Sequence, residues 1–68
     1  MATRITVHFL NGEVVEGTTK SDHLLMNITS MLNGGVPFTL LSIGGIAQRS
    51  IVILSKNVNY VELQEQGD

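Results

Sequence analysis

The stretch from Ser50 to Leu63, with the sequence SIVILSKNVNYVEL, decides the fold of this chain. It begins with an unbroken apolar run, Ile51 to Leu54, and ends with a more alternating segment, Val58 to Leu63, which carries the only tyrosine. Short β-branched runs on either side of a few small polar residues are typical of two strands joined by a tight turn. We therefore expect strands over 49–54 and 58–63, and the preceding residues must complete the sheet and cover it.

The length and composition indicate how many domains the chain forms and whether it associates with copies of itself. A chain of 68 residues is expected to form one domain, over 1–68. Hydrophobic residues make up 43% of it and charged residues only 15%, below the roughly 25% that is usual. A small domain has much surface for its volume, and here few charges cover it. We therefore expect a homo-oligomer, with a monomer of ordinary, partly apolar surface as the alternative.

Several functional classes lack their usual sequence signals. The chain has no cysteine and its two histidines are far apart, so neither a metal nor a cofactor is expected. No paired carboxylates or nucleophile motif occur, so we expect no catalytic residue and no enzyme. The net charge is −2, without a basic patch in the linear sequence. No apolar run reaches the about 20 residues of a membrane span, and no signal peptide begins the chain, so we expect a cytoplasmic protein without a membrane partner.

The N-terminal segment predicts a β-hairpin. Apolar and polar residues alternate over 4–10, and a second strand is expected over 13–19. Asn11-Gly12 lies between them, and both residues accept the positive φ of a type I′ turn. A strict two-residue turn would place Val7 opposite Glu16, which mismatches the faces of the two strands. Either the loop is longer than two residues or a bulge resets the register.

The segment from Lys20 to Gly35 allows two interpretations. Ser21 or Asp22 can cap the start of a helix and Gly34 can end it. Helical spacing is shown by Leu24, Leu25, Ile28, Met31 and Leu32. A period of two, and hence a strand, is shown by Leu24, Met26, Ile28 and Leu32. We expect a short helix over 22–32.

The remaining residues complete a small β protein. Pro37 lacks an amide donor and belongs at the start of a strand, which we expect over 37–43, followed by a turn at Gly44-Gly45. The total is five short strands and one helix between the second and third of them. This pattern predicts a mainly β fold, a partly closed antiparallel barrel whose last strand pairs beside the first.

In this order of elements, the chain resembles the SH3-like small barrels and, within them, the Sm-like group. The first block is VHFLNGEVVEG, with Gly12 and Gly17 at the spacing of the first Sm-like motif, and Met26-Asn27 falls where that motif has its Met-Asn pair. The second block is ILSKNVNYVEL, which follows the second motif at Asn57, Val58, Tyr60, Val61 and Leu63. The resemblance implies a small barrel, ring-type assembly and binding of single-stranded RNA.

Two departures from the Sm-like motifs bear on RNA binding. His23 stands where the family has an acidic residue, and Leu54-Ser55 stands where it has the Arg-Gly pair that helps bind RNA. The resemblance therefore implies fold and assembly more than RNA binding. A second segment, SMLNGGVPFTLL, is similar to an uncharacterised bacterial group of small barrels, from which no activity follows.

Four residues are the candidates for ligand contact through the Sm-like resemblance: His23, Asn27, Lys56 and Tyr60. His8, between apolar neighbours in a strand, is expected to be a half-exposed sheet histidine without a catalytic partner. The expected function is a non-enzymatic barrel that assembles with itself and binds protein partners. The alternative is an Sm-like ring that binds short single-stranded RNA. A helix rather than a strand over 22–32 would count against the alternative, because it removes the second half of the first motif.

Overall fold

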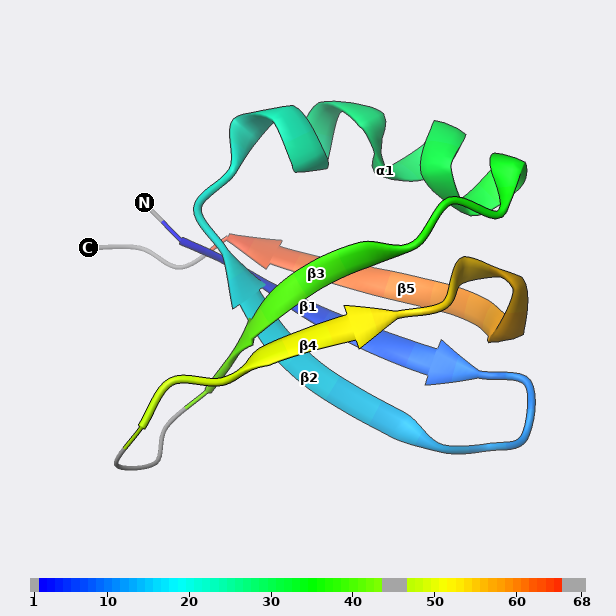
Figure 1. Ribbon diagram of the computed structural model, residues 1–68, viewed down its shortest axis with the longest axis horizontal. Helices are drawn as coiled ribbons and strands as arrows, with labels where there is room; N and C mark the ends of the chain where they lie inside the picture. Colours follow the sequence, from blue (N-terminus) through cyan, green and yellow to red (C-terminus); the bar gives the residue numbers. More distant parts are fainter. Residues whose placement is uncertain (1, 44–46, 66–68) are drawn as a thin grey trace.

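The computed structural model describes residues 2–43 and 47–65. Five antiparallel strands form one sheet in the order β4-β3-β2-β1-β5 (Figure 1). The elements are β1 (Thr3–Phe9), β2 (Val14–Thr19), α1 (Asp22–Gly34), β3 (Phe38–Ser42), β4 (Ser50–Ile53), the 3₁₀ turn η1 (Ser55–Asn57) and β5 (Val58–Glu65). The predicted mainly β fold, with five strands and one helix, is confirmed. The turn predicted at Gly44-Gly45 lies outside the described residues.

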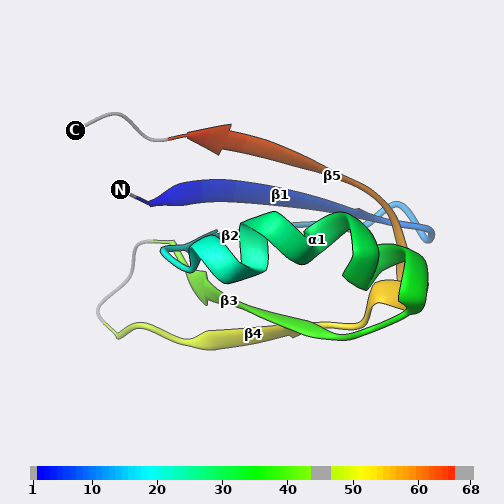
Figure 2. The same cartoon turned by 90° about the horizontal axis from the view of Figure 1, so that it is seen from above.

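The sheet has two open edges. β5 pairs beside β1 along almost its whole length, as predicted for the last and first strands. In the described residues β4 pairs only with β3, so the sheet is open and the predicted closure into a barrel is not shown. Seen from above in Figure 2, α1 lies over the middle of the sheet, with β1 and β5 on one side and β3 and β4 on the other.

The β1–β2 hairpin closes with a three-residue loop. Val7 pairs with Val15, the Phe9 amide donates to the Glu13 carbonyl at 2.9 Å, and the Gly12 amide donates to the Phe9 carbonyl at 3.0 Å. Gly12 has a φ of 92°, and no non-glycine residue of the described chain has a positive φ. The predicted type I′ turn is therefore wrong, because Asn11 stays at negative φ. The longer loop, one of the two predicted ways to align the strands, is confirmed.

The segment after β2 is a helix, and the strand alternative is wrong. The Ser21 hydroxyl caps the helix by accepting the Leu24 amide at 3.1 Å. Gly35 ends it in the left-handed conformation at a φ of 71°, one residue after the predicted Gly34. The helix turns Leu24 and Ile28 toward the sheet.

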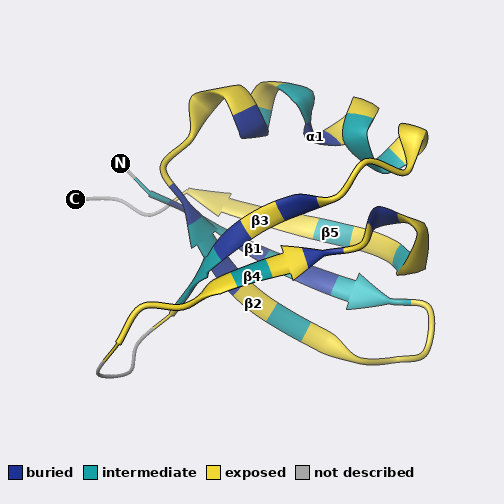
Figure 3. Cartoon of the chain, viewed as in Figure 1, coloured by how far each residue is buried: buried dark blue, intermediate teal, exposed yellow. Residues whose placement is uncertain are grey.

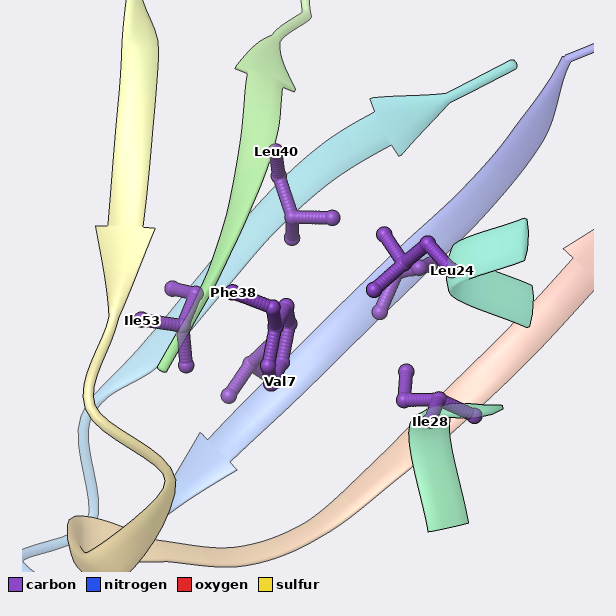
Figure 4. Packing of buried hydrophobic residues seen from close by; sticks show 7 residues of the cluster. Val7, Leu24, Ile28, Phe38, Leu40 and Ile53 are labelled. Carbon is purple, nitrogen blue, oxygen red and sulfur yellow. The ribbon is translucent and has the colours of Figure 1, made fainter. Parts of the chain in front are cut away.

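The core lies between α1 and the sheet face that the helix covers, which we call the inner face. Figure 4 shows its side chains converging from β1, β3, β4 and α1. We call the opposite face of the sheet the outer face. Figure 3 shows that β5 is exposed or half-buried along its length. The buried apolar residues are Ile5, Val7, Leu24, Ile28, Phe38, Leu40 and Ile53.

Candidate functional site

Two of the four candidate contact residues lie together on α1. His23 is exposed in the first turn and Asn27 follows one turn later. The Asn27 side-chain amide donates to the His23 carbonyl at 2.7 Å. One of the two amide protons that Asn27 would offer to a ligand is therefore bonded within its own helix.

The other two candidates lie elsewhere. Lys56 is in η1, whose Ser55 hydroxyl donates to the carbonyl of Val36, just beyond the C-terminal end of α1. A helix of 13 residues is about 20 Å long, and this length separates Lys56 from the first turn with His23. Tyr60 is on β5 and, by strand alternation with Val61, points to the outer face. The structure therefore does not bring the four residues together on one surface.

Tyr60 instead joins a cluster that sequence reasoning missed, which we call the His8 cluster: His8, Tyr60 and Glu62. His8 and Tyr60 are opposite each other across β1 and β5, and their rings stack with centroids 4.1 Å apart at 8°. The His8 Nε2 atom lies 2.7 Å from the Glu62 Oε1 atom. The His8 side chain is 23% exposed, as expected for a half-exposed sheet histidine, and the Glu62 side chain is 64% exposed.

A β-bulge sets this geometry. The pairing of β1 with β5 shifts between His8, opposite Tyr60, and Phe9, opposite Val58, so Asn59 is the extra residue. The bulge aligns Tyr60 and Glu62 with the outer face of β1. A second outer-face pair links Arg4 to Glu16 at 3.5 Å. The stack with Tyr60 and the contact with Glu62 hold the His8 ring in place on the outer face.

The two open edges carry exposed apolar side chains and opposite charges. Near the β4 edge, Val52 is 63% exposed, and the basic residue Arg49 precedes the strand. On β5, Leu63 is 50% exposed, and its charged residues, Glu62 and Glu65, are both acidic. β5 has eight residues and contains neither proline nor lysine, two of the devices that keep an edge strand from pairing, although it carries a bulge at Asn59 and two glutamates.

A shallow pocket of about 300 Å³ lies between the hairpin loop and η1. The Leu10 amide, which donates to the Asn57 carbonyl at 2.9 Å, ties the two segments together there. The pocket is lined by Phe9, Leu10, Asn11, Glu13 and Asn57, and none of the four predicted contact residues is among them. Within the described ranges there is no cluster of three potential metal ligands.

None of the described helices has the length and apolar character needed to cross a membrane. No protein-family model, curated protein or solved structure matches the chain.

Proposed function

We propose that this protein is a non-enzymatic module that assembles with copies of itself and serves as a protein-interaction scaffold. The observation that carries the proposal is the complementarity of the two open sheet edges. An unpaired strand edge presents a row of backbone donors and acceptors to any strand that aligns with it. A second copy of the chain supplies such a strand, because every copy has one edge of each kind.

The charges favour joining the β4 edge to the β5 edge over joining two like edges. Two β5 strands would bring Glu62 and Glu65 against the same acidic residues of the second copy. Joining β5 to β4 instead brings these acids toward Arg49, which precedes β4, and Lys56, which follows it. Opposite charges across a strand pair stabilise it, and like charges destabilise it.

Side-chain alternation and strand direction limit how the two edges can join. Ile51 and Ile53 lie on the inner face of β4, since they pair with Leu40 and Phe38 of the core. Val61 and Leu63 lie on the inner face of β5, opposite Val7 and Ile5. Because all neighbouring strands are antiparallel, β4 and β5 run in the same direction across the sheet. A join that keeps the inner faces continuous is therefore parallel, and an antiparallel join places the inner face of β4 beside the outer face of β5.

An assembly of this kind is heterologous, because the two copies contribute different surfaces. Repeating it produces a ring if the rotation between copies closes and a filament if it does not. A ring removes both open edges of every copy, which supports the closed form for a protein with so exposed a β5 edge.

Size-exclusion chromatography with multi-angle light scattering tests the proposal at micromolar concentration. We expect a mass that is a multiple of the 7.4 kDa chain. Arg49→Glu and Glu65→Arg should each weaken association about tenfold, since each removes the charge difference between the two edges, and the double variant should restore it. The control is the double variant Arg4→Glu/Glu16→Arg, which reverses an outer-face pair away from the edges. A strict monomer, or single reversals without effect, would overturn the proposal.

The finer fold assignment, an SH3-like small barrel, is part of this proposal. The pairing of β5 beside β1 supports it, because a small barrel places its last strand there. The helical conformation of Met26 and Asn27 counts against the Sm-like subgroup and its RNA binding, since the motif needs them on a strand. RNA binding stays a prediction, tested by titrating oligo-U at low salt, where phosphate contacts are strongest. The cytoplasmic location also stays a prediction.

A further inference from the structure

The exposed apolar side chains at the two open edges lie on opposite faces of the sheet. On β4, Val52 is 63% exposed and alternates with the buried Ile53, so it lies on the outer face. Leu54, which follows in extended conformation, is 47% exposed and continues the alternation of β4. On β5, Leu63 is opposite the buried Ile5 and therefore lies on the inner face, yet it is 50% exposed. Each edge thus presents apolar surface, β4 on its outer side and β5 on its inner side.

The backbone groups that remain free along β4 belong to the same residues as its exposed apolar side chains. The Ser42 amide of β3 donates to the Arg49 carbonyl at 2.8 Å, and these two residues continue the register of β3 and β4. In an antiparallel ladder every second residue directs both backbone groups to the same neighbour. The backbone groups of Ser50, Val52 and Leu54 therefore point to the open edge.

The same accounting identifies the free backbone groups of β5. The Phe9 amide donates to the Glu13 carbonyl at 2.9 Å, so Phe9 and every second residue before it on β1 bond toward β2. His8 and its alternating neighbours on β1 therefore bond toward β5, where His8 is paired with Tyr60. The residues of β5 whose backbone groups point to the open edge are Val61, Leu63 and Glu65.

We propose that β4 of one copy and β5 of the next join as antiparallel strands, with Val52 opposite Leu63. Two residues along, Leu54 comes opposite Val61. This inference rests on the proposed function and identifies the side chains that the joined copies cover. An antiparallel join bonds the free residues of the two edges to each other, and it places the outer face of β4 beside the inner face of β5. The exposed apolar side chains of both edges then cover one another.

A parallel join fits the exposed side chains less well. It keeps the inner faces continuous, so Val52 of one copy comes beside an outer-face residue of the next β5, such as Glu62. Covering a carboxylate with an apolar side chain costs the carboxylate part of its hydration. In the antiparallel register Glu65 comes opposite Ser50, the neighbour of Arg49, so the acidic end of β5 meets the basic start of β4.

Disulfide trapping tests the register, because the chain has no cysteine of its own. Two variants of the full chain, Val52→Cys and Leu63→Cys, are mixed in equal amounts and oxidised mildly. Bonded opposite residues have Cα atoms about 5.5 Å apart, a separation that a disulfide spans. We expect at least about tenfold more covalent dimer in the mixture than in either variant alone, because only the mixture brings two thiols together at high effective concentration. The control mixture, Val52→Cys with Glu62→Cys, would cross-link only in the parallel join.

Val52→Thr tests the apolar contact while the side chain stays β-branched. We expect the association constant, measured by sedimentation equilibrium, to fall about fourfold, the effect of one methyl group that is no longer buried. Val14→Thr is the matched control, since Val14 is 53% exposed and lies on β2, an inner strand of the sheet. It should leave the association constant unchanged.

The outcomes separate this inference from the proposed function. Cross-links in the control mixture alone, or an assembled protein without cross-links in either mixture, would overturn the inference and leave the edge-to-edge assembly standing. Equal association of Val52→Thr and the unmodified protein would likewise overturn the apolar contact. Equal dimer formation in each cysteine variant alone would mean that like edges meet. That result, or a monomer in light scattering, would overturn the inference and the proposed function together.

Discussion

The two faces of the sheet contrast sharply although they are built from the same strands. On β1, Ile5 and Val7 of the inner face are completely buried, whereas Arg4, Thr6 and His8 of the outer face stay partly exposed. The inner face is held by apolar contacts with α1, and the outer face by an ion pair, a histidine–glutamate bond and a ring stack. This contrast indicates that fold stability comes mainly from the inner face, while the outer face and the edges keep much of their surface exposed.

The strongest test of this contrast is Ile5→Ala. Ile5 is fully buried under the helix, so the substitution removes apolar contacts and leaves a cavity. We expect the free energy of unfolding to fall by about 2–5 kcal/mol, measured by urea denaturation at low protein concentration. In a domain this small, the loss is a large part of the total stability.

Thr6→Ala is the matched control for that prediction, because Thr6 is the next residue on the same strand and lies on the outer face. We expect it to change the free energy of unfolding by about 0.5 kcal/mol or less. If Thr6→Ala were as destabilising as Ile5→Ala, the two faces would contribute equally and the contrast would be wrong.

Gly17→Ala probes how closely the inner face is packed. A Cβ atom at Gly17 would lie 2.7 Å from the Leu40 Cβ atom and 3.1 Å from the Leu41 carbonyl oxygen. Neither atom is the free end of a flexible side chain, so β2 and β3 must separate. We expect a loss of about 1–3 kcal/mol in the free energy of unfolding.

The control for this prediction is another glycine with room around it. Gly34 ends α1, and a Cβ there would meet only the Val36 Cγ2 atom at 3.7 Å, an ordinary contact. Gly34→Ala should therefore be neutral or stabilising by up to about 1 kcal/mol, because alanine favours the helix. Equal losses in both variants would indicate a general cost of replacing glycine rather than close packing at β2.

The contrast between the faces also explains what the sequence could predict. Alternation over 4–10 and the β-branched run at 51–54 located the strands, and the spacing of Leu24 and Ile28 located the helix, because burial on one face leaves a period in the sequence. Pairing β5 beside β1 followed from the need to cover edges. The inner face is therefore largely predictable from local pattern.

The outer-face site was beyond local pattern. His8 and Glu62 are 54 positions apart, and their contact depends on the one-residue bulge at Asn59, which carries no sequence signal of its own. His23, Asn27 and Lys56 were grouped through a resemblance that assumed a strand where α1 lies. Tyr60 was predicted as a ligand contact, and its stacking partner His8 could only be found once the strand register was known.

Ser21→Ala tests the segment that joins the sheet to the helix. The Ser21 hydroxyl satisfies the Leu24 amide, and Leu24 is one of the two residues that α1 buries in the core. Loss of this cap should lower the free energy of unfolding by about 1 kcal/mol, less than the loss of a core side chain. Ser21→Asp, which retains a capping oxygen, should restore most of it. If the aspartate variant were as unstable as the alanine variant, the cap would not be the cause.

The smallest effect is expected for Glu16→Gln on the outer face. Glu16 and Arg4 form a pair with a 3.5 Å separation, and their side chains are 49% and 39% exposed, so water and salt screen the attraction. We expect a change within about 0.5 kcal/mol in the free energy of unfolding, and a smaller one still at high salt. A loss near that of Ser21→Ala would mean that the outer face shares in holding the sheet together. In that case the His8–Glu62 contact on the same face would also be expected to contribute to the free energy of unfolding.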